Sequence, residues 1–150
     1  NARAQNSLGN CYYYGYGVTQ DYNKAVEWYT KSAEQNYDLA QYKLGTCYYD
    51  GLGVEQDYVT AAEWFAKAAN QNHVKAQYEL GNCYFEGKGV EQNYTTAVEW
   101  YIKAAEQFDR WVYANGKKLS GAKITLKCDE NAETETVFML PSSHFEVTLH

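Results

Sequence analysis

Apolar and polar positions along the chain follow a pattern that returns with a fixed period. The pattern starts at three alanines whose numbers differ by 36, which are Ala4, Ala40 and Ala76. Within the middle stretch, apolar residues at i, i+4, i+7 and i+8 share one face of a helix: Ala40, Leu44, Cys47 and Tyr48. A period of this length is typical of helical repeat arrays.

A second helix is predicted in each repeat, behind a glycine-rich turn. In the middle repeat, Gly51 and Gly53 end the first helix because glycine adopts left-handed backbone conformations without a steric cost. The N-cap of the second helix is expected at Asp57, and Asp21 and Asn93 stand at the same place in the other repeats. The apolar face of the second helix consists of Ala61, Trp64, Phe65, Ala68 and Ala69, matched upstream by Ala25, Trp28, Tyr29, Ser32 and Ala33 and downstream by Ala97, Trp100, Tyr101, Ala104 and Ala105.

A glycine also lies inside the first helix of each repeat, at Gly9, Gly45 and Gly81. Glycine in a helix interior costs about 1 kcal/mol relative to alanine, so a compensating reason is needed. We expect these glycines to allow close approach of the second helix.

The stretch "AQYKLGTCYYDGLGVEQDYVTAAEWFAKAANQ" at residues 40–71 resembles the Sel1-like repeat. This tetratricopeptide-like unit has the pattern A-x-x-x-L-G-x-x-Y-x-x-G-x-G-V, followed by D-Y-x-x-A-x-x-W-[YF]-x-K-A-A. The resemblance assigns residues 1–108 to three repeats, at about 4–39, 40–75 and 76–108. It implies a mainly α fold, a right-handed α-α solenoid, and a non-catalytic role as an adaptor or scaffold that assembles protein complexes.

Three cysteines, Cys11, Cys47 and Cys83, take the same position in the first helix of each repeat. A cysteine-rich branch of the family joins its helices by disulfides, but the corresponding residues at the first junction here are Ala33 and Ala40. We therefore expect three buried thiols that act as small apolar side chains. A redox or metal role, in which cysteines of different repeats meet, is the alternative. The lack of these disulfides fits a reducing compartment, and the localisation is otherwise open.

The geometry of such solenoids implies that the first helices line the concave side. Their positions that do not face the core are rich in tyrosine and asparagine: Asn6, Asn10, Tyr13, Tyr14, Tyr42, Thr46, Tyr49, Asp50, Tyr78, Asn82, Phe85 and Glu86. Amide side chains can donate to and accept from an extended backbone, and tyrosine offers a large contact area with little rotamer entropy to lose. We predict that this surface binds a peptide or protein partner.

A comparison of the chain with itself supports a binding role for these positions. Residues 40–71 and 76–107 are identical at 21 of 32 positions. Three of the four differences between positions 43 and 50 fall on the expected binding surface: Thr46 against Asn82, Tyr49 against Phe85, and Asp50 against Glu86. Free drift of exposed positions would explain the same differences without a partner.

The repeat pattern ends after Glu106, and the sequence that follows predicts β-strands. Asn115 and Gly116 form a hairpin signal between stretches expected to be extended. Residues 109–150 are predicted to form an antiparallel unit of three or four strands. The phrase "NGKKLSGAKITL…FMLPSSHFEVTL" is similar to carboxypeptidase-regulatory-like β-sandwich domains. Phe108 and Trp111, placed just past the last helix, could cap the solenoid, and a strand edge within residues 110–150 could instead make a homo-oligomer.

Charge and composition narrow the classes of partner. The formal charge of −6 argues against nucleic acid, which needs a basic face on the protein. No apolar run approaches the roughly 18 residues of a membrane span, so no membrane insertion is expected. The chain starts at Asn1 rather than at methionine, and we read it as an excerpt from a longer protein.

Candidate catalytic and metal-binding patterns are sparse. Ser120 and Lys123 satisfy the S-x-x-K pattern of serine acyl-enzymes, but they precede a strand and no companion motif is present. Cys128, His144 and His150 are the weak candidates for metal ligands. We expect no enzyme activity, no metal and no cofactor. The leading hypothesis is a protein–protein interaction adaptor, and the alternative is an assembly module that oligomerises through residues 110–150.

Overall fold

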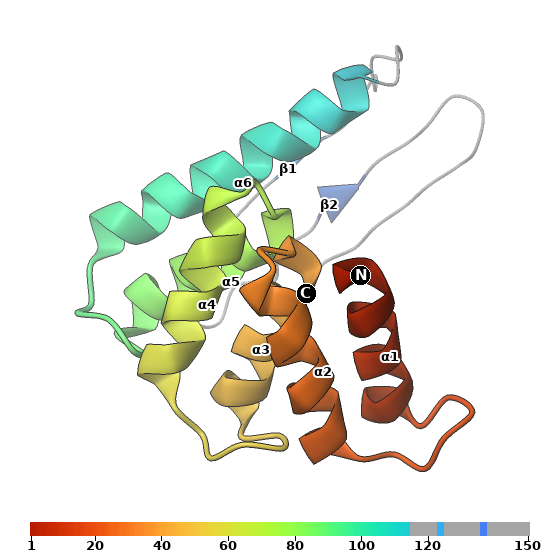
Figure 1. Ribbon diagram of the computed structural model, residues 1–150. Coiled ribbons are helices and arrows are strands. Elements are labelled where there is room, and N and C mark those ends of the chain that lie inside the picture. The colour runs from red at the N-terminus through yellow and green to blue at the C-terminus, as the bar shows by residue number, and fades with distance from the viewer. Residues whose placement is uncertain (115–122, 125–135, 138–150) are drawn as a thin grey trace.

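The computed structural model describes residues 1–114, 123–124 and 136–137, with side chains up to residue 107. The described part contains the α-helices α1 (Ala2–Tyr14), α2 (Tyr22–Glu34), α3 (Asp38–Asp50), α4 (Tyr58–Asn70), α5 (Val74–Glu86) and α6 (Tyr94–Ala114). Consecutive helices pack against one another and progress from α1 at one end to α6 at the other (Figure 1). The predicted α-solenoid of three helix pairs is therefore present.

The helix boundaries follow from the predicted caps. The side-chain oxygens of Asp21, Asp57 and Asn93 accept bonds from backbone N–H groups three residues later, at 3.2, 3.2 and 3.0 Å. The first helix of the middle repeat ends at Gly51, which has a left-handed φ of 70°. These local signals set the lengths of the helices before any packing is considered.

The glycines inside the first helices do allow close approach of the second helices. A Cβ at Gly45 would lie 2.7 Å from Cδ1 of Phe65, a distance that real Cβ atoms essentially never show. Gly9 and Gly81 lie equally close to the rings of Tyr29 and Tyr101. One large ring per repeat thus fits where the first helix has no side chain, which explains why glycine is tolerated there.

The core runs between repeats as two clusters of buried residues. One cluster joins α2 to α3 and the other joins α4 to α5. Cys47 and Cys83 are buried in these clusters as predicted, and burial raises the pKa of each thiol to about 12. Cys11 differs from the expectation because it is only half-buried. Among the described helices and strands, none packs on α1 as α2 packs on α3.

Helix α6 continues to Ala114, so the prediction of an extended stretch before Asn115 was wrong. In the first two repeats, Asn36 and Asn72 end the second helix with left-handed φ values of 64° and 66°. Asparagine tolerates this conformation, but the residue at the same place in α6 is Phe108, and a bulky residue does not adopt it readily. Without the helix-ending asparagine, α6 runs on, and it contains Phe108 and Trp111.

The tail after α6 is described only at two short strands. β1 (Lys123–Ile124) pairs with β2 (Thr136–Val137) antiparallel, with Lys123 opposite Val137 and Ile124 opposite Thr136. A β unit of three or four strands is not seen among the described residues. The rest of that prediction, including the proposed role of residues 110–150 in oligomerisation, lies largely outside them. Within the described part, no helix is long and apolar enough to cross a bilayer.

Candidate functional site

The predicted binding positions lie on α1, α3 and α5. Side-chain contacts of Lys43 and Lys88 connect them. We call the side chains at these twelve positions the α1/α3/α5 surface. Tyr14 and Tyr78 are 45% and 43% exposed, and Asp50 and Glu86 are also exposed. Tyr13, Tyr42, Tyr49 and Phe85 are half-buried. The surface therefore presents aromatic area in every repeat.

Lys43 connects the first and second repeats on this surface. Its Nζ donates a hydrogen bond to the hydroxyl of Tyr14 at 2.9 Å. The same ammonium lies 5.6 and 5.3 Å from the ring centres of Tyr13 and Tyr14, which is within the range of a cation–π contact. The side chain from α3 thus holds two tyrosines of α1.

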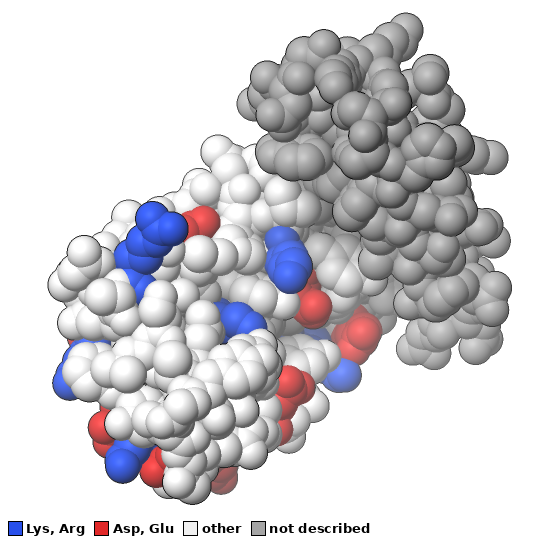
Figure 2. All heavy atoms as spheres, turned by 90° about the vertical axis from the view of Figure 1, so that its right-hand side faces the viewer, with Lys and Arg blue, Asp and Glu red and all other residues white. Residues whose placement is uncertain are grey.

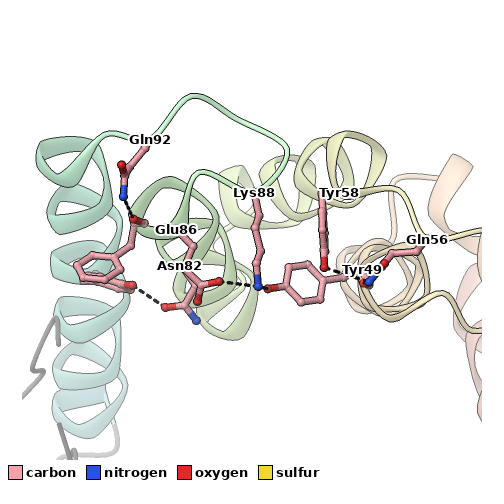
Figure 3. Close-up of polar contacts among 9 residues, drawn as sticks. Tyr49, Gln56, Tyr58, Asn82, Glu86, Lys88 and Gln92 are labelled. Atoms are coloured by element: carbon pink, nitrogen blue, oxygen red, sulfur yellow. Dashed lines mark hydrogen bonds and ion pairs between the residues drawn. The ribbon is translucent and has the colours of Figure 1, made fainter. Parts of the chain in front are cut away.

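Lys88 makes the equivalent connection between the second and third repeats (Figure 3). Its Nζ lies 2.8 Å from Oε2 of Glu86 and donates to the hydroxyl of Tyr49 at 3.2 Å. The ammonium also lies 5.4 and 5.5 Å from the ring centres of Tyr49 and Tyr58. The bond to Glu86, followed by that to Tyr49, raises the pKa of Lys88, so the lysine stays charged at neutral pH.

Tyr42 lies between the second and third repeats and stacks on His73. Their ring centres are 4.9 Å apart, with the planes inclined by 23°. His73 is half-buried and is the N-cap of α5, where its Nδ1 accepts from the backbone N–H of Ala76 at 3.1 Å. Burial lowers the pKa of His73, so it is a neutral structural residue at neutral pH.

Glu79 is a half-buried carboxyl group beside this aromatic area. Burial is the largest cause that raises its pKa, and the negative charges of Asp50 and Glu86 raise it further. A hydrogen bond with the side chain of Asn82 lowers the pKa of Glu79 and so opposes these effects. The third repeat is thus more acidic on this surface than the second, which has Lys43 at the same position.

Two asparagines of the α1/α3/α5 surface, Asn10 and Asn82, have structural partners. The hydroxyl of Tyr29 donates to Oδ1 of Asn10 at 2.7 Å, and the hydroxyl of Tyr101 donates to Oδ1 of Asn82 at 2.5 Å. The middle repeat lacks both groups, because Phe65 replaces the tyrosine and Thr46 replaces the asparagine. The difference between Thr46 and Asn82 therefore follows the aromatic residue of the second helix, and partner recognition is not needed to explain it.

Asn6 differs from the other predicted positions because it is only 6% exposed. Its Oδ1 is buried without a hydrogen-bond partner among the described atoms. A buried amide cannot reach a ligand on the surface unless the fold rearranges. The exposed tyrosines are therefore better placed to contact a partner than Asn6, Asn10 and Asn82.

Three residues that contact the tyrosines of the α1/α3/α5 surface were not predicted from the sequence: Lys43, Tyr58 and Lys88. The comparison of the chain with itself could have pointed to both lysines, because they differ from the equivalent residues of the other repeat. When residues 40–71 and 76–107 are aligned, Lys43 corresponds to Glu79, and Lys88 corresponds to Leu52. The contact of each lysine with the preceding repeat depends on the stacking of helix pairs. It could not be derived from the spacing alone.

The exposed surface of the second helices is more uniform. Each second helix places a lysine ammonium over a tryptophan ring one turn away, at 4.2 to 4.3 Å. The pairs are Lys31 with Trp28, Lys67 with Trp64, and Lys103 with Trp100. A contact repeated without change in every repeat is typical of a structural role.

The described residues offer no assembled site for chemistry. Among them, no group of three or more His, Cys, Asp or Glu side chains is placed to hold a metal ion. Ser120, Cys128, His144 and His150 lie outside the described residues, and Lys123 is in β1. Asn93, which begins a glycosylation sequon, has a structural role as the N-cap of α6.

Solved structures of other proteins resemble this chain closely. A Sel1 repeat protein from Oxalobacter formigenes is 43% identical with a TM-score of 0.71, and the match covers 77% of this chain and 47% of that one. A protective antigen of uropathogenic Escherichia coli strains, c5321, is 41% identical with a TM-score of 0.70, over 77% of this chain and 26% of that one. Helicobacter pylori cysteine rich protein B is 31% identical with a TM-score of 0.54, and the match covers 55% of this chain and 62% of that one. No curated protein matches the chain.

The chain spans about half the length of the first of these structures and about a quarter of the second. The family model of the Sel1 repeat matches residues 2–37, 38–73 and 74–107. Nothing in the comparisons supports the resemblance of the tail to carboxypeptidase-regulatory-like domains. Since the matched repeats cover more than half of its residues, the chain belongs to the Sel1 repeat family.

Proposed function

We propose that the α1/α3/α5 surface binds an extended segment of a protein partner, and that the chain acts as an adaptor without catalysis. Proteins with Sel1 repeats generally mediate protein–protein interactions. The observation that carries the proposal is the exposure of tyrosine on the first helices of the first and third repeats, at Tyr14 in α1 and Tyr78 in α5. Tyrosine is enriched among residues that dominate binding energy at interfaces.

Lysine contacts fix the geometry of this aromatic area before a partner arrives. Lys43 holds Tyr14 by a hydrogen bond, and Lys88 holds Tyr49 in the same way. Side chains ordered in advance lose less entropy on binding, so more of the contact energy appears as affinity. The alternation of tyrosines with Asp50 and Glu86 favours a partner with apolar and basic residues.

The structural hydrogen bonds decide which variants test the proposal. Asn82→Ala would remove the partner of the Tyr101 hydroxyl and would alter the fold as well as the surface. Tyr14→Ala and Tyr78→Ala remove exposed aromatic area and leave the Asn–Tyr hydrogen bonds between helices in place. Tyr14→Ala also removes the hydroxyl that accepts from Lys43. Val59→Ala is the matched control, because Val59 is 55% exposed and lies on α4, outside the α1/α3/α5 surface.

The experiment selects peptides from a random library on the parent chain and then measures their affinity for each variant by titration calorimetry. We expect Tyr14→Ala and Tyr78→Ala each to weaken a selected peptide by about tenfold or more. Val59→Ala should leave the affinity unchanged. Equal affinity for the parent chain and the double variant Tyr14→Ala, Tyr78→Ala, with circular dichroism showing both folded, would overturn the proposal.

A further inference from the structure

We propose that the partner segment carries one acidic and one basic residue, and that the α1/α3/α5 surface binds it in a single orientation, with the acidic residue at Lys43 and the basic residue at Glu79. This inference rests on the proposed function, because it names the chemistry of the partner that the same surface takes. It comes from one position of the first helices whose charge differs in every repeat.

That position is occupied by Ser7 in α1, Lys43 in α3 and Glu79 in α5, which follow one another at intervals of 36 residues. Ser7 is exposed, and Lys43 and Glu79 are half-buried. The side of the molecule on which α1 lies is largely uncharged, with its lysines, arginines and carboxylates in small scattered groups (Figure 2). At this one position, the surface thus changes from uncharged to positive to negative between α1 and α5.

Lys43 places its positive charge at the junction of α1 and α3. Its ammonium donates to the hydroxyl of Tyr14 and lies over the rings of Tyr13 and Tyr14, as described above. An ammonium group has three N–H donors, and this bond uses one of them. Among the described side chains, no carboxylate forms an ion pair with Lys43. Donors therefore remain for an acidic side chain of the partner.

Glu79 places its negative charge at the junction of α3 and α5. Burial raises the pKa of Tyr42, on α3, and the negative charge of Glu79 raises it further, so the two side chains interact across the junction. Asp50, also on α3, acts in the same way on Glu79. No lysine, arginine or histidine forms an ion pair with Glu79 in the described part of the chain, whereas Glu86 is paired with Lys88.

An unpaired, half-buried carboxylate lowers the stability of the fold, because burial disfavours its charged form and the neighbouring carboxylates repel it. A bound ammonium or guanidinium group would remove this cost by supplying the missing positive charge. Tyr78, the residue before Glu79, is 43% exposed, and tyrosine rings attract cations. Ionisable groups that are perturbed in this way are concentrated at functional sites. Charge complementarity thus selects a basic side chain as the occupant at Glu79.

The distance between the two charges sets the spacing in the partner. Packed helices lie about 10 Å apart and an extended chain rises about 3.3 Å per residue, so the acidic and basic residues are about three positions apart. The opposite order would bring like charges together at both junctions, and such contacts exclude a wrong partner. The surface therefore accepts the segment in one orientation only.

The test starts from peptides selected from a random library on the parent chain, which should share this pair of charges. Each selected peptide is also made with its acidic and basic residues exchanged, so that the composition is the same. In titration calorimetry, we expect the parent chain to bind the selected form about tenfold more tightly or better. The double variant Lys43→Glu, Glu79→Lys should prefer the exchanged form. If circular dichroism shows that this variant is unfolded, Lys43→Gln, Glu79→Gln replaces it and should bind both forms equally.

Glu79→Gln alone should weaken the selected peptide by about tenfold, without any loss of stability to urea at pH 7. A purely structural role of Glu79 would not give this combination. Glu63→Gln is the matched control, because Glu63 is exposed on α4, outside the α1/α3/α5 surface, and its affinity should equal that of the parent chain.

Two results would overturn the inference, and they separate it from the proposed function. Peptides that lose affinity on Tyr14→Ala and Tyr78→Ala, yet bind equally in both charge orders, would refute the inference and leave the proposed function standing. A library that yields no binding peptide would refute the proposed function, and this inference with it.

Discussion

The pairing of Asn with Tyr in the outer repeats, and of Thr with Phe in the middle repeat, can be tested by rebuilding the pair. Phe65 is 2% exposed, and the equivalent Tyr29 is fully buried, with its hydroxyl donating to Asn10 at 2.7 Å. Phe65→Tyr alone would place a hydroxyl group beside Thr46 without this asparagine. A buried polar group that lacks its partner costs about 1–3 kcal/mol, so we expect the free energy of unfolding to fall by about that amount.

Adding Thr46→Asn to Phe65→Tyr restores the pair found in the first and third repeats. A hydrogen bond between side chains contributes about 0.5–1.5 kcal/mol, and the penalty for the unpaired hydroxyl is also removed. We therefore expect a coupling energy of about 1–2 kcal/mol in a double-mutant cycle. The assay is urea unfolding of the four proteins, followed by far-ultraviolet circular dichroism. Additive effects of the two substitutions would refute the claim that the surface difference at Thr46 has a structural cause.

Three further predictions concern the core and the surface. Gly45→Ala should lower the free energy of unfolding by about 1–2 kcal/mol in urea, because overpacking against the ring of α4 costs about 1–3 kcal/mol and exceeds the gain of about 1 kcal/mol in helix propensity. Cys47 and Cys83, with pKa values of about 12, should react with a thiol reagent at pH 8 far more slowly than the half-buried Cys11, as mapped by mass spectrometry; equal rates would contradict the burial. Glu79 has a folded pKa above its ordinary value of 4.5, so its contribution to stability is most favourable below pH 4.5 and is lost as the pH rises through the folded pKa. Glu79→Gln should therefore stabilise the protein at pH 7 and should make unfolding less dependent on pH above 4.5.

Much of the fold could be predicted because each repeat contains the residues that start and end its own helices. Asp57 caps a helix and Gly51 ends one through interactions that are local in sequence, so their roles follow from residue type and position. The close approach at Gly45 was also foreseeable, because a glycine kept inside a helix needs a packing reason. The continuation of α6 was missed although its cause is local, since Phe108 replaces the asparagine that ends the other second helices.

The site was less predictable because its contacts join different repeats. The contact of Lys88 with Tyr49 depends on how helix pairs stack, and that geometry is not encoded in the spacing within one repeat. The structural role of Asn82 depends on Tyr101, which is 19 residues away on another helix. Comparison of paired positions in the three repeats, rather than of single positions, would have revealed this dependence from the sequence.

The location of the binding surface is tested most directly by mapping amide chemical shifts in the ¹⁵N-labelled chain as a selected peptide is added. We predict that the largest changes fall on α1, α3 and α5, around Tyr14, Tyr49 and Tyr78, while the exposed face of α4 near Val59 is unaffected. Changes confined to α2, α4 and α6 would contradict the assignment of the binding surface to the first helices of the repeats.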